Sequence, residues 1–196
     1  MSMGRNRMEA FSDGVLAIII TIMVLELKVP HDPSLEGLKP LLPVFLSYVL
    51  SFLYVGIYWN NHHHMLHTVK QVNGATLWAN MHLLFWLSLF PFVTAWMGEN
   101  HFAPNTVALY GVVLLMAAIA YYILSQCLIK GHGQDSLLQR AIGKDWKGKM
   151  SVVVYAAGVA LCFVNHWISL ALFTLVALIW LVPDKRIEHI FASDQG

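Results

Sequence analysis

The sequence is poor in charged residues. Aspartate, glutamate, lysine and arginine make up 12% of its 196 residues, against about 25% in an average soluble domain. Hydrophobic residues make up 58%, and the mean hydropathy is +0.61. This composition excludes a water-soluble globular domain and predicts a lipid bilayer as the surrounding solvent. The formal net charge is only +1, and no basic tail is present, so we expect no nucleic-acid partner.

Cysteine is also scarce. The two cysteines, Cys127 and Cys162, lie in apolar segments. They are too few for a disulfide framework and lack the spacing of a zinc site. The His-Glu-x-x-His pattern of zinc hydrolases is missing as well. We therefore expect two buried thiols and neither an enzyme nor a bound cofactor.

Long apolar runs dominate what is present. Six such segments are found, at about 8–28, 38–59, 75–97, 105–128, 150–165 and 167–183. The first four reach the roughly 20 residues that a membrane-spanning helix needs. The last two are short and lie close together, so they either form a tight helical hairpin or include one incomplete span. We predict an all-α polytopic membrane protein whose single domain, residues 1–196, has six transmembrane helices. Pro91 predicts a kink in the third.

The basic residues indicate the orientation. If the amino terminus is cytoplasmic, only Lys28 and Lys39 lie outside. The other ten basic residues then lie on the cytoplasmic side: Arg5, Arg7, Lys70, Lys130, Arg140, Lys144, Lys147, Lys149, Lys185 and Arg186. Cytoplasmic loops are enriched in lysine and arginine. We therefore predict a multi-pass protein of the cell membrane with both termini in the cytoplasm.

The first apolar segment carries a polar pair at its entrance. A helix turns by 100° per residue, which brings Thr21, Ile22 and Leu25 within about 60° of Ile18. Gly14, Phe11 and Arg7 lie close to the same stripe, whereas Ser12 and Asp13 point to the opposite half of the helix. A carboxylate in hydrocarbon is costly and usually has a partner. Spacing alone favours ordinary packing, with the polar pair bonded to neighbouring helices.

Three motifs in the first half of the chain resemble those of a known family. The first has Arg7, Phe11, Ser12 and Asp13, followed by Gly14, Val15, Ala17, Ile18, Thr21 and Leu25. The second is Tyr58-Trp59-x-x-His62-His63, and the third is Leu89-Phe90-Pro91-Phe92-Val93-Thr94. Together they resemble prokaryotic relatives of transmembrane protein 175, the lysosomal potassium channel family.

The resemblance implies a homotetramer of six-helix subunits whose first helices line a central pore for potassium and other monovalent cations. Ile18 would form the narrowest hydrophobic ring, Thr21 a ring of hydroxyls, and Ile22 and Leu25 further apolar layers. The resemblance also implies a structural motif that holds this helix against its neighbours. That motif comprises Arg7, Phe11, Ser12, Asp13, His62 and His63.

A hydrophobic constriction is physically compatible with the sequence. The chain has no Thr-Val-Gly-Tyr-Gly segment, so potassium cannot be dehydrated by a ring of backbone carbonyls. Converging aliphatic side chains can instead gate a pore by excluding water. The resemblance also implies selectivity for potassium that is weaker than that of channels with a carbonyl filter.

The second segment ends in a cluster of histidines, His62, His63, His64 and His67. His63 and His67 are four residues apart, so both could present one helical face to a metal. No carboxylate or cysteine lies close in sequence, and we expect no metal, although the spacing leaves such a site open. The family resemblance instead makes His62 or His63 a hydrogen-bond partner of the first helix.

Three other functions remain as alternatives. A proton- or cation-coupled secondary transporter could use Asp13 to bind the coupling ion, but transporters commonly show paired repeats and broken helices, and neither is clear in this sequence. An intramembrane metalloenzyme would need a metal on the histidines. A purely structural membrane protein leaves the long first motif unexplained.

Overall fold

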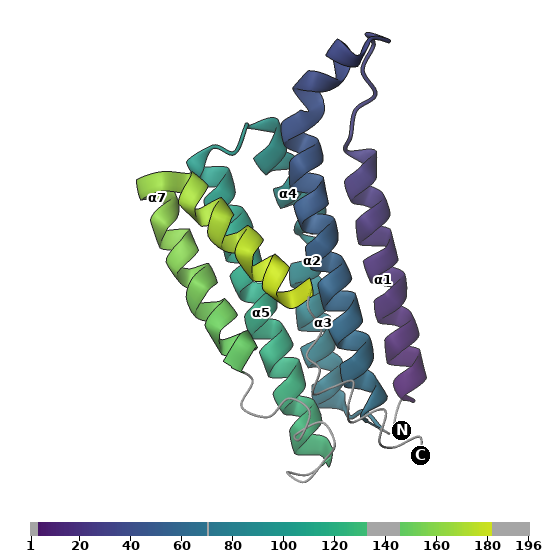
Figure 1. Ribbon diagram of the computed structural model, residues 1–196. Helices are drawn as coiled ribbons and strands as arrows, with labels where there is room; N and C mark the ends of the chain where they lie inside the picture. Colours follow the sequence, from purple (N-terminus) through teal and green to yellow (C-terminus); the bar gives the residue numbers. More distant parts are fainter. Residues whose placement is uncertain (1–3, 70, 133–145, 182–196) are drawn as a thin grey trace.

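The chain folds as a bundle of helices (Figure 1). The computed structural model describes residues 4–69, 71–132 and 146–181. The helices are α1 (Arg5–Leu25), the 3-10 helix η1 (Leu35–Leu41), α2 (Leu42–His67), α3 (Gly74–Ser88), α4 (Phe90–Glu99), α5 (Pro104–His132) and α7 (Trp146–Leu181). Within these described residues, five spans are long and apolar enough to cross a membrane: Arg5–Leu25, Leu35–His67, Gly74–Glu99, Pro104–Gly131 and Trp146–Leu181. The predicted all-helical class is confirmed.

The third span is broken near its middle. α3 ends at Ser88 and α4 begins at Phe90, with Pro91 in the first turn of α4. Proline lacks an amide hydrogen, and its ring clashes with the carbonyl four residues earlier. The kink expected at Pro91 therefore takes the form of a break between two helices.

The last span turns back on itself at Asn165. This residue has φ −157° and ψ 104°, which is extended backbone inside an otherwise helical run. Its side-chain Oδ1 accepts a hydrogen bond from the backbone N of Trp167 at 3.0 Å, so it caps the second half. Figure 1 shows the green half of α7 running in one direction and the yellow half returning. The expected boundary between segments 150–165 and 167–183 falls at this turn.

Close helix contacts build the core. α5 packs against α7 and α3, and α2 packs against α4. A Cβ added to Gly111 or Gly158 would approach the ring of Phe173 to 2.5 or 2.4 Å, so these glycines make room for that buried side chain. The backbone of α7 at the same residue is held as well, because the Tyr54 hydroxyl donates to the Phe173 carbonyl at 2.6 Å.

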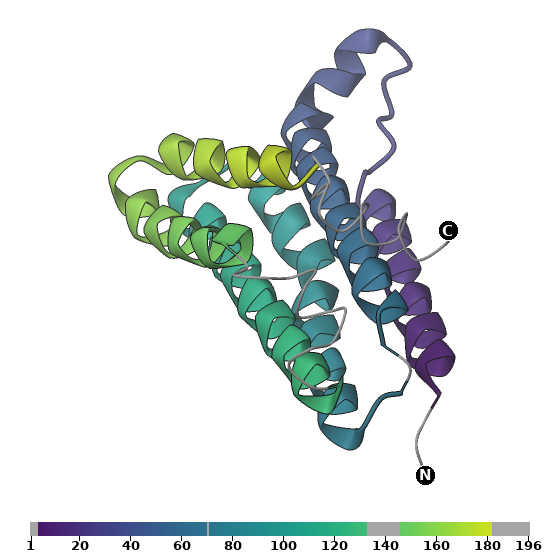
Figure 2. The ribbon, with the colours of Figure 1, turned by 60° about the horizontal axis from the view of Figure 1, so that its bottom comes forward.

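α1 lies at the edge of the bundle. It contacts α2, α3 and α4, and Figures 1 and 2 show it on the opposite side from α7. Five of its residues are buried: Met8, Ser12, Leu16, Ile19 and Met23. Their spacing of three or four residues forms one helical stripe that faces the rest of the chain.

Beyond α1, Lys28 Nζ donates to Glu99 Oε1 at 2.9 Å, and this bond raises the pKa of Lys28.

Candidate functional site

The outer face of α1 is apolar, and the described residues of the chain do not cover it. Ile18, Ile22 and Leu25 are 58%, 41% and 78% exposed, and Thr21 and Gly14 lie exposed on the same side. A Cβ added to Gly14 would meet no atom within 4 Å. We call the face formed by Gly14, Ile18, Thr21, Ile22 and Leu25 the α1 stripe. One subunit alone leaves it to lipid or to another protein chain.

The hydroxyl of Thr21 has a fixed orientation on this stripe. Its Oγ1 donates to the Ile18 carbonyl at 2.8 Å, one turn back along the helix. A hydroxyl has a single donor and two acceptor lone pairs. Because the donor is used within the helix, only lone pairs remain for a ligand outside it, and lone pairs suit a cation.

The opposite edge of α1 is tied to α2 through polar side chains. Trp59 Nε1 donates to Asp13 Oδ1 at 3.1 Å, and the Trp59 ring stacks on His63, with centroids 6.0 Å apart and planes at 22°. His63 Nδ1 lies 3.0 Å from Glu9 Oε1. Glu9 and Asp13 are four residues apart on α1, as are Trp59 and His63 on α2, so matching turns of the two helices meet.

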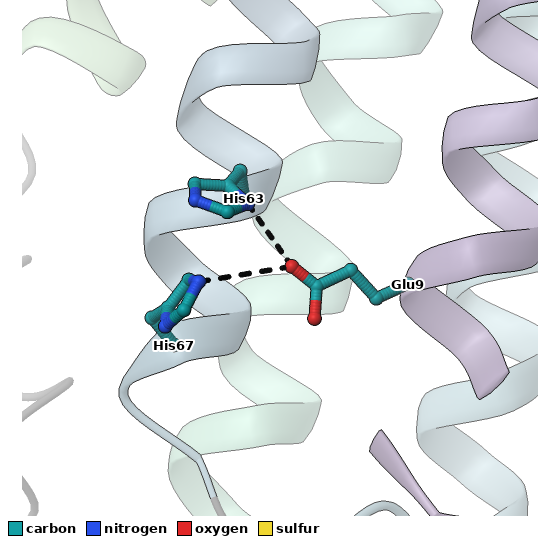
Figure 3. Close-up of side chains that lie close together, drawn as sticks. All are labelled: Glu9, His63 and His67. Atoms are coloured by element: carbon teal, nitrogen blue, oxygen red, sulfur yellow. Dashed lines mark hydrogen bonds and ion pairs between the residues drawn. The ribbon is translucent and has the colours of Figure 1, made fainter. Parts of the chain in front are cut away.

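The lower end of this contact gathers three ligand-type side chains. Figure 3 shows His63 and His67 reaching from α2 toward the carboxylate of Glu9 on α1. His67 Nε2 lies 3.9 Å from Glu9 Oε1. Arg5 Nε lies 3.9 Å from the other carboxylate oxygen, Oε2, and Arg5 also donates to the Val69 carbonyl at 3.4 Å.

A second, buried set of hydrogen bonds joins α1, α3 and α2. Ser12 Oγ donates to the Met8 carbonyl at 2.8 Å and accepts from Asn80 Nδ2 at 2.9 Å. Asn80 Oδ1 lies 2.8 Å from His62 Nε2. Ser12, Asn80 and His62 are each at most 2% exposed. Because Asn80 Oδ1 can only accept, His62 carries its proton on Nε2, and His62 Nδ1 has no hydrogen-bond partner within the described residues.

The sequence-predicted polar residues have different surroundings in the structure. His63 bonds α1 directly through Glu9, whereas His62 reaches Ser12 only through Asn80. Arg7 is exposed, and its side chain makes no hydrogen bond or ion pair within residues 4–69, 71–132 and 146–181. Its neighbour Arg5 makes such contacts instead. Phe11 is 53% exposed.

Sequence reasoning missed Glu9 and Asn80. A signal existed for each. Glu9 precedes Asp13 by four residues and so shares its helical face, and Asn80 is an amide inside an apolar run, where such a group needs a partner. Neither signal identifies that partner, which comes from another helix.

Comparison with known proteins gives consistent matches. A family model described as endosomal/lysosomal potassium channel TMEM175 matches residues 7–91. The chain is 59% identical to a potassium channel of Chryseobacterium sp. strain P1-3 over 186 residues, which cover 95% of this chain and 97% of that one. It is 33% identical to a potassium channel of Streptomyces collinus, over 88% and 89% of the two chains.

Structural and more distant matches agree with these. The crystal structure of a lysosomal potassium-selective channel TMEM175 homolog from Chamaesiphon minutus superposes with a TM-score of 0.78 at 30% identity, covering 91% of this chain and 96% of that one. The chain is also 24% identical to the endosomal/lysosomal proton channel TMEM175 of Mus musculus, but covers only 36% of that protein.

Proposed function

This chain belongs to the TMEM175 potassium channel family, and from that membership we propose that it forms a potassium-conducting cation channel in the cell membrane. The observation that carries the proposal is the α1 stripe. Its members are exposed in the subunit although they are mostly aliphatic, and they lie on the helix at the edge of the bundle. Large exposed apolar patches mark contact surfaces with protein or membrane.

The channel is a homotetramer in this proposal, with six transmembrane helices in each subunit when the two halves of α7 are counted separately. Four α1 helices surround a central axis and turn their stripes toward it. Two observations support this arrangement: α1 lies at the edge, so it can reach a shared axis, and Gly14 leaves open space for a neighbouring helix to approach.

Ile18 forms the narrowest ring of the proposed pore. Ile22 and Leu25 add apolar layers, and such constrictions close by excluding water. Thr21 supplies hydroxyl oxygens next to Ile18, and its lone pairs are oriented for a cation because its proton is bonded to the Ile18 carbonyl. Potassium and other monovalent cations pass with part of their hydration shell replaced there.

Both termini are cytoplasmic in the proposed orientation. This follows from the distribution of lysine and arginine over the loops. The start of α1, with Glu9, and the end of α2, with His63 and His67, then lie at the cytoplasmic side.

A coupled transporter is less well supported. It would need Asp13 on the ion path, but Asp13 points away from the α1 stripe and accepts a hydrogen bond from Trp59. The same contact favours a structural role for Asp13, which fixes α1 against α2.

Planar-bilayer recording of purified protein tests the proposal. With potassium on one side and sodium on the other, the wild-type protein should carry current under an electrical gradient alone. Ile18→Asn should raise that current, because a polar side chain weakens the exclusion of water. Val24→Asn is the matched control, since Val24 is 43% exposed but lies about 120° from Ile18 around the helix. Equal currents from wild type and Ile18→Asn would contradict Ile18 as the constriction.

A further inference from the structure

We propose that Glu9, His63 and His67 form a binding site for a divalent transition-metal ion of the zinc class, which bridges α1 and α2 (Figure 3). The three ligand atoms lie within 4.8 Å of one another. Metal binding at this site does not depend on conduction through the proposed channel.

Two of the three distances between ligand atoms lie near the spacing that a zinc ion requires. Nitrogen and oxygen ligands lie about 2.0–2.1 Å from zinc in tetrahedral geometry, which places any two ligand atoms about 3.3 Å apart. Glu9 Oε1 lies 3.0 Å from His63 Nδ1 and 3.9 Å from His67 Nε2. These two distances lie on either side of the ideal value, and the ligand atoms of His63 and His67 lie within 4.8 Å of each other, so side-chain shifts of at most about 1.5 Å complete the geometry.

The donor set is one that zinc uses. Two imidazoles and one carboxylate bind zinc with a remaining position for water. The histidines lie one turn apart on α2, whereas the carboxylate comes from α1, so the set exists only when the two helices are packed together. This distinguishes the site from a pair of surface histidines, which could bind metal on an isolated helix.

The surroundings hold the ligands in place. Trp59 stacks on His63 and fixes its ring. Arg5 lies beside Glu9 Oε2, which leaves Oε1 to the histidines and predicts ligation by a single carboxylate oxygen. The Glu9 side chain is 15% exposed, while the side chains of His63 and His67 are 39% and 42% exposed. The carboxylate is therefore largely buried, and a metal ion can reach the site from the side of the two histidines. On binding, the metal replaces any proton between His63 and Glu9.

Zinc titration of the full-length, tag-free protein in detergent tests the site, with a chromophoric indicator competing for the ion. One zinc per chain is expected. Glu9→Gln keeps the shape of the side chain but removes its charge, and His67→Ala removes a ligand; each should weaken binding at least about tenfold, because even changes outside the ligand set cost that much. His31→Ala is the control, since His31 is exposed in the loop after α1.

Thermal unfolding gives an independent readout. Zinc should raise the midpoint of the wild-type protein and of His31→Ala, because a ligand that binds only the folded state stabilises it. It should raise the midpoint of Glu9→Gln much less. If His67→Ala does not fold, the zinc affinity and the unfolding midpoint of Glu9→Gln test the site without it. Wild-type affinity in Glu9→Gln, or an equal loss in His31→Ala, would overturn the proposal.

Discussion

Single polar side chains determine how α1 is held within an otherwise apolar bundle. Asn80 is the central one, because its amide donates to Ser12 of α1 and accepts from His62 of α2. In a buried site the cost of an unmade hydrogen bond exceeds the net gain from a made one. The three side chains therefore specify one rotation of α1, with Ser12 turned inward and Ile18, six residues later, turned outward.

Replacement of Asn80 by leucine should destabilise the subunit. It leaves the buried Nε2 of His62 without a partner, at about 1–3 kcal/mol, and it removes the bond that Ser12 accepts, although Ser12 still donates to the Met8 carbonyl. We expect a loss of roughly 2 kcal/mol or more in unfolding free energy, measured by reversible denaturation in detergent. Met81→Leu is the control, because Met81 is the next residue and is 45% exposed. Equal stability of the two variants would show that the buried set contributes nothing.

Thr21 carries a prediction about selectivity. Thr21→Val keeps the shape of the side chain and removes the hydroxyl oxygen, so the preference for potassium over sodium should fall. The reversal potential under bi-ionic conditions measures this change. Thr21→Ser keeps an oxygen at the same place and should stay close to wild type. An unaltered reversal potential in Thr21→Val would remove Thr21 from the ion path.

Helix elements approach one another closely where glycine permits it. A Cβ on Gly98 of α4 would lie 2.5 Å from the Cα of Val44 on α2, a backbone atom that cannot rotate away. Gly56 of α2, in contrast, has no atom within 4 Å of such a Cβ. The packing of α4 on α2 therefore depends on Gly98, and α4 in turn contacts α1.

Gly98→Ala should lower stability by about 1–3 kcal/mol through overpacking. Gly56→Ala should be neutral or slightly stabilising, because alanine favours a helix over glycine. Unfolding midpoints of the two variants measure the difference. A Gly98→Ala protein as stable as Gly56→Ala would contradict the close contact of α2 and α4.

Sequence patterns predicted most helices because the physical cause of each is local. Apolar length indicated the spans, Pro91 the break before α4, and the α1 stripe followed from a turn of 100° per residue. The bond between Glu9 and His63 joins residues 54 positions apart, and that between Asn80 and Ser12 joins residues 68 apart. Such pairs depend on how each helix is rotated in the bundle. Packing between helices determines that rotation, and the periodicity within one helix does not.

At the scale of the whole molecule, the subunit has an apolar face on α1 that its described residues do not cover. The outer face of α1 is aliphatic apart from Gly14 and the hydroxyl of Thr21, whereas the inner face of the same helix is buried and its one polar side chain, Ser12, is hydrogen-bonded. In the proposed tetramer, neighbouring copies cover the outer face around a shared axis. Bonds within the subunit then set the direction in which the α1 stripe points.

A substitution at Gly14 tests assembly of the tetramer separately from folding of the subunit. In Gly14→Phe, the new Cβ meets no atom within 4 Å among the described residues of the subunit, so helix content should be unchanged, but the bulky ring should obstruct four converging helices and reduce the tetramer fraction. Native mass spectrometry measures the oligomer, and circular dichroism measures the helix content. Val24→Phe, exposed but off the stripe, should leave the tetramer intact. Full tetramer from Gly14→Phe would place the contact elsewhere.

The central claim is that Ile18 faces the axis of an assembly. Electron cryo-microscopy of the purified oligomer in lipid nanodiscs tests it most directly, because the map locates α1 relative to the symmetry axis and to lipid. We predict four copies with the Ile18 side chains closest to the axis and Thr21 beside them. Ile18 and Leu25 turned toward lipid, or α1 helices at the outer rim, would contradict it.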